Sequence, residues 1–307
     1  MTGLLTLSME VELGWGVHDT GEDDRLSDRG EAERHYLARL LEACATLDVP
    51  ISFDVVGHLF LDSCPGTHES PHPSGWFAAD PGTDGETDPL YYAPDVVDAI
   101  RSAPTDHELC THTFSHALFD QTSREACRWE LDRVQELHRE RAGRPAESLV
   151  PPRHQRPPYD VLTDRGIRVL RPAMPRQTDS RVARYRQLLA GPQPLSTLDR
   201  RNGVVETSCT TYPSLTAATL PAGQGGHDPL FRPIPTPVRR RLHLRKLKRA
   251  TRTAVERDGH LHLWCHLFDL SNEQQWRTVR PYLTWLSDYR QSNDLVISTM
   301  EGLTAHV

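Results

Sequence analysis

Apolar runs typical of strands alternate with amphipathic runs typical of helices along most of this 307-residue chain. Residues 4–13 begin apolar and then alternate, residues 32–47 carry apolar side chains at helical spacing, and the succession recurs as far as residues 295–300. Strands that alternate with helices are typical of parallel sheets with helical crossovers. We therefore expect an α/β protein, and about seven such units favour a distorted (β/α) barrel over an open sheet.

Residues 63–89 interrupt this succession. They hold five prolines, at positions 65, 71, 73, 81 and 89, with glycines and acidic residues between them and no hydrophobic period. Long loops in compact domains are often lids or binding loops, and otherwise they are surface insertions. We expect one catalytic domain over residues 1–307, with a loop insertion at about 63–89.

Charge and apolar content exclude several classes of protein. The formal net charge is −7, which argues against a nucleic-acid partner. No uncharged apolar run approaches the ~18 residues that a membrane-spanning helix needs. Met1-Thr2-Gly3 lead into the first apolar run without a basic segment, so we expect no signal peptide and a cytoplasmic protein.

Cysteine spacing argues against a metal site built on thiolates. The six cysteines stand at positions 44, 64, 110, 127, 209 and 265, and none forms a Cys-x-x-Cys pair. In a cytoplasmic chain such residues are usually reduced thiols, often buried. We therefore expect no cysteine-based zinc site.

Three His-x-x-x-His pairs are present: His68/His72, His112/His116 and His262/His266. About one would occur by chance, so the surroundings must distinguish them. The first pair lies in the proline-rich loop, where we expect a solvated segment. The second follows the strand expected at 107–111, at a strand end where α/β folds place ligands. If that segment turns helical, its two histidines share a face and can share a metal.

Glu10 and Glu12 share one face at the end of the first expected strand, because strand side chains repeat every two residues. A catalytic zinc site with two histidines needs an anionic third ligand and an open position. One of these carboxylates could supply that ligand.

Taken together, these segments resemble the polysaccharide deacetylases, the family of chitin and peptidoglycan deacetylases. The motifs that carry the resemblance are Ser8-Met9-Glu10-Val11-Glu12-Leu13-Gly14-Trp15-Gly16, His112 to His116, Val150-Pro151-Pro152-Arg153-His154-Gln155 and Leu261-His262-Leu263-Trp264-Cys265-His266. They occur in the family's order and at predicted strand ends. Arg156-Pro157-Pro158 offers a second arginine, but the distance from Arg153 to residues 160–162 fits the family better.

The resemblance implies metal-dependent hydrolysis of an N-acetyl group on a sugar, with one divalent metal ion, most readily zinc. By position in the motifs, Glu10 is the general base, Arg153 orients it and His266 is the general acid. Glu12, His112 and His116 hold the metal. Trp264 lines the acetyl pocket, and Trp15 contacts substrate. His262 lies mid-strand and is expected to be structural.

Two departures from the family pattern bear on activity. The family's base is usually Asp, and the extra methylene of Glu10 moves the carboxylate by about an ångström, which can cost on the order of 100-fold in rate. The site has then adjusted, changed substrate or lost activity. The Asp that tunes the acid His also has no clean match, and Glu206 and Asp269 are both candidates.

Basic residues are concentrated in one run, over residues 239–252. We expect a helix that buries Val238, Leu242, Leu247, Ala250 and Ala254. The cations form either a solvated face or a contact for an anionic partner, such as a nucleotide-linked sugar, a lipid-linked glycan or a membrane surface.

Three functions follow from these observations. The leading hypothesis is a cytoplasmic deacetylase that acts on a sugar intermediate of surface-glycan synthesis. A second is a hydrolase of another non-peptide C–N bond, such as a cyclic ureide, because relatives of this fold carry out that reaction. A third is a glycan-binding protein that has lost catalysis at Glu10.

Overall fold

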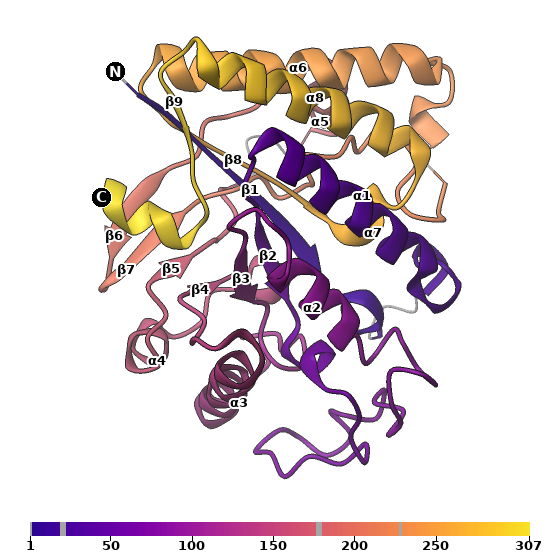
Figure 1. Ribbon diagram of the computed structural model, residues 1–307, viewed down its shortest axis with the longest axis vertical. Coiled ribbons are helices and arrows are strands. Elements are labelled where there is room, and N and C mark those ends of the chain that lie inside the picture. Colours follow the sequence, from indigo (N-terminus) through magenta and orange to yellow (C-terminus); the bar gives the residue numbers. More distant parts are fainter. Residues whose placement is uncertain (1, 19–22, 176–179, 227–228) are drawn as a thin grey trace.

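The computed structural model describes residues 2–18, 23–175, 180–226 and 229–307 (Figure 1). In these residues one sheet runs in the order β6-β7-β5-β4-β3-β2-β1-β8, and β9 pairs with β1 beside β2. The strands are β1 Gly3–Val11, β2 Ser52–Val55, β3 Glu108–Thr111, β4 Ser148–Leu149, β5 Val169–Leu170, β6 Leu198–Arg201, β7 Val204–Thr207, β8 His260–His266 and β9 Leu295–Ile297.

The sheet is a nearly closed barrel. Every strand pair is parallel except the β6–β7 hairpin. The segment before β6 reaches the other end of the sheet, where the Ser196 amide donates to the His260 carbonyl of β8 (2.8 Å). The expected (β/α) barrel is confirmed.

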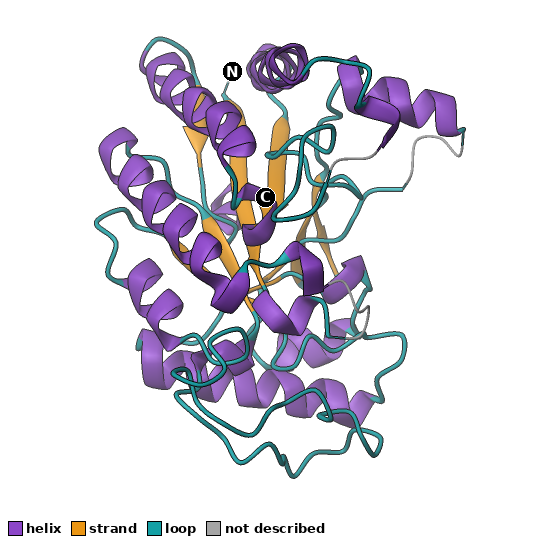
Figure 2. Cartoon of the chain, turned by 90° about the vertical axis from the view of Figure 1, so that its right-hand side faces the viewer, coloured by secondary structure: helices purple, strands orange, loops and turns teal. Residues whose placement is uncertain are grey.

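Helices surround the strands, as Figure 2 shows. They are α1 Glu31–Leu47, α2 Pro94–Arg101, α3 Arg124–Ala142, α4 Tyr159–Asp164, α5 Arg181–Ala190, α6 Thr236–Glu256, α7 Leu267–Leu270 and α8 Glu273–Gln291. Their ends follow local chemistry: α3 begins after Ser123, whose hydroxyl accepts from the Ala126 amide (3.1 Å), and ends before Gly143 at φ 75°. Among the described helices, none has both the length and the apolar character needed to cross a membrane.

The longest of the described strands is β1, and all nine of its residues are buried. A strand that is buried on both faces is typical of a parallel sheet covered by helices. Glu10 on β1 is in register with Asp54 on β2 and with His266 on β8. The carboxyl ends of these neighbouring strands therefore meet at one edge of the sheet, which is where parallel barrels place their ligands.

The basic helix α6 differs from its predicted form. Val238 is 45% exposed, so its expected place in the buried stripe is wrong, whereas Arg239 and Lys246 are buried. Arg239 donates to the carbonyl groups of Thr219 and Ile234, and Lys246 donates to the Gln187 carbonyl (3.3 Å). These two cations support packing, and contact of the remaining ones with an anionic partner stays a prediction.

The insertion at 63–89 contains no helix or strand of the sheet, as expected, yet its two ends are joined to each other (Figure 1). Its two arms meet at the Ser63–Asp84 bridge, and the Cys64 amide donates to the Thr83 carbonyl (3.2 Å). Only 10% of the His68 side chain and 1% of the His72 side chain are exposed. The expectation that this histidine pair is solvated is wrong.

Candidate active site

Glu10 and Glu12 lie at the carboxyl end of β1, and both are almost fully buried. The chain turns directly after Glu12 through Leu13, at φ 46°, into the short 3-10 helix Leu13–Gly16. That turn brings Gly16 against Glu12: a Cβ on Gly16 would lie 2.7 Å from the Glu12 Cβ, closer than side chains approach. Glycine at this position therefore leaves the room that the Glu12 carboxylate occupies.

His112 and His116 approach Glu12 from a loop, not from the helix that their spacing suggested. Thr113 and His116 have positive φ values, 63° and 58°, which non-glycine residues adopt rarely and often at functional sites. The buried carboxylate of Glu130 on α3 holds this loop. It accepts from the amides of Phe114 (2.7 Å) and Ser115 (2.9 Å) and from the Ser115 hydroxyl (2.6 Å).

The three predicted metal ligands converge on one point. His112 Nε2 lies 2.9 Å and His116 Nε2 lies 3.3 Å from Glu12 Oε1. His112 Nδ1 donates to the Val150 carbonyl (2.8 Å), because a carbonyl can only accept, and a neutral imidazole then has a lone pair on Nε2. That lone pair faces a carboxylate oxygen in a buried site, and a proton or a metal ion between the two atoms removes their repulsion. Two imidazoles and a carboxylate suit a divalent metal such as zinc, so the residues fit the expected group.

Glu10 lies beside this point: one ligand atom each of Glu10, Glu12 and His266 lie within 4.8 Å of one another, and an arginine contacts Glu10. The guanidinium of Arg171, just after β5, is fully buried, contacts Glu10 Oε1 and donates to Ser8 Oγ (2.7 Å). The expectation that Arg153 orients Glu10 is corrected, because Arg171 contacts Glu10, whereas Arg153 is exposed on the 3-10 turn Pro152–His154 and lines the pocket beside the site. Burial raises the pKa of Glu10, but the charges of Arg171 and His266 outweigh it and bring that pKa to about 2.

His266 lies on the other side of Glu10 and has a carboxylate partner of its own. Its Nε2 is 3.2 Å from Glu10 Oε2, and its Nδ1 is 2.9 Å from Asp269 Oδ2. Burial lowers the pKa of His266, but the negative charges of Asp269 and Glu10 outweigh it and raise that pKa well above 6.5. Of the two candidates for the tuning carboxylate, the structure brings Asp269 to His266, whereas Glu206 pairs with Arg156.

A pocket of about 250 Å³ opens beside these groups. Its lining includes Glu10, Glu12, Gly16, Val17, Arg25, His116, Arg153, His154, Thr211, Pro213, Trp264, His266 and Phe268. Trp264 is one of these lining residues, and its contact with an acetyl group stays a prediction. Its ring also covers the Arg171 guanidinium at 4.8 Å, and its Nε1 donates to the Thr210 carbonyl (2.8 Å).

Trp15 lies elsewhere. It is fully buried, its ring is 4.5 Å from that of His58, and its Nε1 donates to the Tyr91 carbonyl (3.3 Å). The turn after Glu12 directs this side chain into the core, away from the residues that line the pocket. The expected substrate contact of Trp15 is therefore corrected to a packing role. His262 is structural, as expected, because it is buried between Ser8 Oγ and Thr207 Oγ1 (2.9 Å each).

Sequence reasoning did not single out Asp54 or Arg171. Asp54 is fully buried beside Glu10, and neither of its carboxylate oxygens has a hydrogen-bond partner in the described residues. Its oxygen lies 4.0 Å from the Arg171 guanidinium. Burial raises the pKa of Asp54 to about 8, with Arg171 opposing and Glu10 adding to the increase. The available signal for Asp54 was a charged residue inside the apolar run that forms β2.

Comparison with solved structures identifies the fold. A protein from Mycobacterium smegmatis described as a polysaccharide deacetylase superposes with a TM-score of 0.62 at 16% identity, over 100% of this chain and 90% of its own. A protein from Pseudomonas aeruginosa with the same description gives 0.58 at 12% identity, over 99% and 90%. This chain has the fold of the polysaccharide deacetylases.

That fold is not restricted to one reaction. PuuE allantoinase superposes with a TM-score of 0.60 at 11% identity, over 99% of this chain and 89% of its own. No protein-family model matches the sequence, and no curated protein matches it. The resemblance found in the motifs is thus confirmed at the level of the fold, while the reaction has to be argued from the site.

Proposed function

We propose that this protein is a metal-dependent hydrolase that removes an N-acetyl group from a sugar. One observation supports this above all others. The group Glu12, His112 and His116 adjoins a pocket that also contains a carboxylate held by arginine and a histidine held by aspartate. A metal site, a base and an acid beside one pocket are the parts that hydrolysis of an amide requires.

Glu12, His112 and His116 would hold the metal. When bound, a divalent metal polarises the amide carbonyl and acidifies a water molecule. The carbonyl of Val150 fixes the His112 tautomer, and Glu130 fixes the loop that carries both histidines. Such outer partners orient metal ligands and raise their affinity. Zinc is the metal we propose, because this ligand set is common in catalytic zinc sites.

Glu10 is the proposed general base. With its pKa at about 2 the carboxylate is ionised at neutral pH and accepts a proton from the attacking water. Arg171 holds one of its oxygens, and Trp264 covers that guanidinium from the pocket. The other oxygen faces His266.

His266 is the proposed general acid. Its raised pKa keeps the imidazole protonated at neutral pH. One proton is committed to Asp269 through Nδ1, which leaves the proton on Nε2 for the departing amine. Glu10 Oε2 and His266 Nε2 are 3.2 Å apart. The carboxylate that accepts a proton from water therefore lies next to the imidazole that donates a proton to the amine.

The substrate class follows from the pocket and from the deacetylases that share the fold. Trp264 and Phe268 give the pocket aromatic walls, which suit the apolar face of an acetamido group or a sugar ring. Arg25 and Arg153 also line it, which supports a phosphate-bearing glycan, linked to a nucleotide or a lipid, as the finer proposal. A cytoplasmic location and a role in surface-glycan synthesis stay predictions.

Hydrolysis of a cyclic ureide is the second candidate, because an allantoinase has the same fold. The two candidates differ in the bond that is broken and in the product. A binding protein without activity is the third, and it makes no product at all.

The test combines product detection with metal analysis. The purified protein is assayed for acetate release from N-acetylated nucleotide sugars, lipid-linked sugars and chitin oligomers, and for ring opening of allantoin. Acetate release that is lost in Glu10→Gln and in His112→Ala supports the proposal. Ring opening without acetate release favours the second candidate, and neither product from any substrate favours the binding protein.

A further inference from the structure

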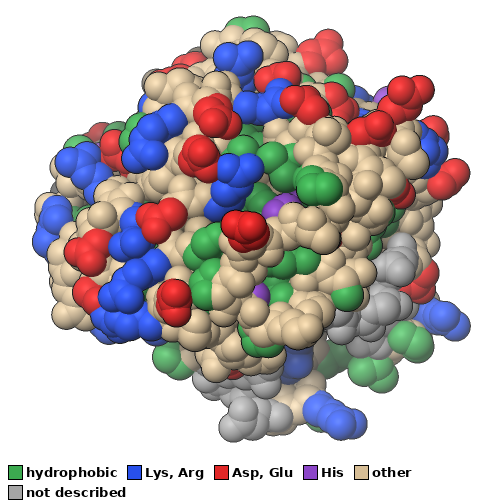
Figure 3. Space-filling view, turned by 90° about the horizontal axis from the view of Figure 1, so that it is seen from below, with side chains coloured by type: hydrophobic (Ala, Val, Ile, Leu, Met, Phe, Trp, Pro, Cys, Tyr) green, Lys and Arg blue, Asp and Glu red, His purple; other side chains and the backbone are tan. Residues whose placement is uncertain are grey.

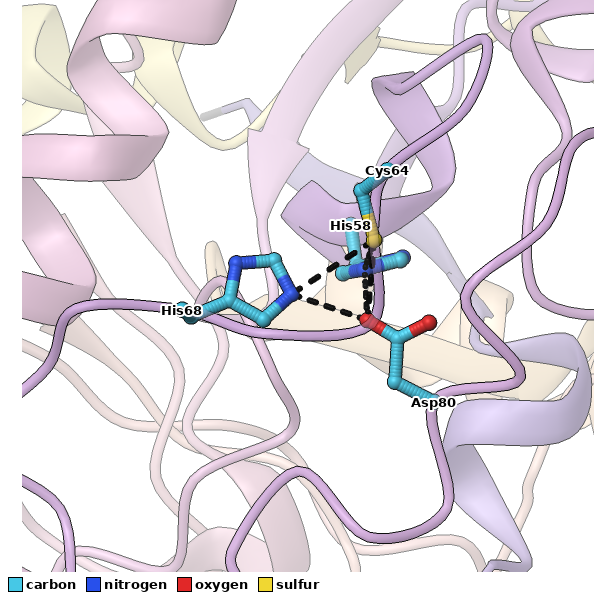
Figure 4. A group of neighbouring side chains, drawn as sticks. All are labelled: His58, Cys64, His68 and Asp80. Carbon is cyan, nitrogen blue, oxygen red and sulfur yellow. Dashed lines mark hydrogen bonds and ion pairs between the residues drawn. The ribbon is translucent and has the colours of Figure 1, made fainter.

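Four side chains from the start and the middle of the 63–89 insertion and from the turn before it point toward one another (Figure 4). They are His58, Cys64, His68 and Asp80, and one ligand atom from each lies within 4.8 Å of all the others. His58 is on the 3-10 helix Gly57–Phe60 that follows β2. We propose that these four residues bind a structural zinc ion, which joins the two arms of the insertion to the barrel.

The separations between the sulfur and the two imidazole nitrogens suit a tetrahedral ion. Cys64 Sγ lies 3.6 Å from His58 Nε2 and 3.7 Å from His68 Nε2. Zinc bonds of about 2.0 Å to nitrogen and about 2.3 Å to sulfur give ligand separations of about 3.5 Å. Asp80 Oδ2 is closer, 2.8 Å from His68, 2.9 Å from His58 and 3.0 Å from Cys64.

The hydrogen-bond roles are compatible with a metal ion at the centre. His58 Nδ1 faces the Tyr91 carbonyl (3.1 Å), which can only accept, so this nitrogen carries the proton. Neutral His58 then has a lone pair on Nε2, directed at a carboxylate oxygen 2.9 Å away in a fully buried position. Two acceptors at this distance repel one another unless a proton or a metal ion lies between them.

The surroundings hold each ligand as in a metal site. The Tyr92 hydroxyl (2.5 Å) and the Gly82 amide (3.0 Å) donate to Asp80 Oδ1, which leaves Oδ2 for the centre. The Gly66 amide donates to Cys64 Sγ (3.3 Å), which stabilises a thiolate. Hydrogen bonds of this kind fix the orientation of metal ligands. Imidazole and thiolate together select zinc over magnesium or calcium.

Four protein ligands leave no position for substrate, which is typical of structural zinc. The insertion has no helix or strand of its own, so an ion that joins residues 58, 64, 68 and 80 would supply much of its order. The insertion in turn contacts the catalytic loop, because the Trp76 indole donates to Ser115 Oγ (2.8 Å), next to His116. The expectation of no cysteine-based zinc site rested on the absence of a Cys-x-x-Cys pair, and here the ligands come from separate turns.

Cobalt(II) substitution tests the proposal on the unmodified protein. The active-site group contains no sulfur, so a thiolate-to-cobalt charge-transfer band in the near ultraviolet reports on Cys64. We expect this band in the wild type, its retention in His112→Ala and its loss in Cys64→Ser. The other five cysteines are buried outside both groups and serve as internal controls.

Zinc content gives the second measurement. We expect two zinc ions per chain in the wild type and one in Cys64→Ser, in His68→Ala and in His112→Ala. His72→Ala is the matched control in the same loop and keeps both ions. A wild type without the cobalt–sulfur band, or a Cys64→Ser variant with unchanged zinc, overturns the proposal. Neither result affects the proposed hydrolase, which depends on the zinc that His112→Ala removes.

Discussion

The active-site group and the insertion cluster are built from the same kinds of side chain but differ in what surrounds them. Glu12, His112 and His116 offer three ligand atoms and adjoin a pocket, whereas His58, Cys64, His68 and Asp80 offer four and lie in the insertion and on the 3-10 helix before it. A zinc ion with three protein ligands has a position for substrate, and one with four has none. Seen from the side of the insertion, histidine reaches the surface only in small patches (Figure 3).

The comparison shows that the residues around each group, and not its histidines alone, distinguish the two roles. In both groups one imidazole donates through Nδ1 to a carbonyl and directs Nε2 at a carboxylate oxygen. Besides this shared arrangement, only the active-site group has a second carboxylate and a third histidine beside it, Glu10 and His266. Chemistry is therefore expected at one group and structural support at the other.

The largest effect should come from removing the base while leaving both groups able to bind metal. In Glu10→Gln we expect turnover to fall roughly 10²- to 10⁴-fold, the usual contribution of a general base. Zinc content should stay at the wild-type value, because Glu10 is held by Arg171 and not by the metal group. Steady-state kinetics and elemental analysis measure the two. Undiminished acetate release would show that Glu10 is not the base.

A smaller effect is expected when a residue next to a ligand is changed and the ligands themselves are kept. It should lower the zinc affinity of the active-site group and leave the insertion cluster unchanged. In Gly16→Ala the new Cβ meets the Glu12 side chain, so zinc affinity of the active-site group should fall roughly 10- to 100-fold, as when outer partners of ligands are changed. The cobalt–sulfur band of the insertion cluster should persist. Gly226→Ala is the control, because nothing lies within 4 Å of a Cβ there. Equal zinc affinity in both variants would contradict the crowding at Glu12.

The sequence predicted the elements whose patterns are strong. The buried run of β1 and the helical spacing of α1 gave the alternation from which the barrel follows, and Glu12, His112 and His116 were found from their motifs. The hairpin β6–β7 was not expected as such, although Asn202-Gly203, with positive φ at both residues, is a typical hairpin turn. Helix α5 was missed because it buries none of its residues and has no apolar stripe.

Contacts between distant segments could not be predicted in the same way. Arg171 reaches Glu10 across 161 positions in the sequence, and only the barrel register brings them together. Arg153 was chosen by its spacing from neighbouring motif residues, which does not determine where a guanidinium points. The insertion cluster was missed for a related reason: a loop without periodicity has no pattern from which the convergence of residues 58, 64, 68 and 80 could be inferred.

The activity of the proposed active site should depend on pH through its proton donor, His266. The insertion cluster has no catalytic proton donor in this proposal. In Asp269→Asn the negative charge that raises the pKa of His266 is removed, so that pKa falls. An acid must be protonated to act, and the alkaline decline of kcat/KM should therefore begin at lower pH than in the wild type. Asp288→Asn, on the exposed face of α8, should leave the profile unchanged. An identical decline in the wild type and Asp269→Asn would exclude His266 as the acid.

The smallest effect concerns a buried histidine that faces no carboxylate, His138 on α3. It is 1% exposed, its Nε2 has no partner in the described residues, and burial lowers its pKa to about 3. Between about pH 3 and 6.5 the unfolded chain then binds a proton that the folded chain does not. The stability that His138 contributes is present above pH 6.5 and is lost as the pH falls toward 3. His138→Leu should therefore reduce the drop in melting temperature between about pH 6.5 and 5 by roughly 2–4 °C.

His35→Leu, at an exposed position of α1, is the control and should melt with the wild-type pH dependence. If melting temperature depends on pH in the same way in His138→Leu and in the wild type, His138 is charged in the folded protein. Its burial away from any carboxylate would then not lower its pKa. His112 is the contrasting case, because its contact with Glu12 outweighs burial and raises its pKa.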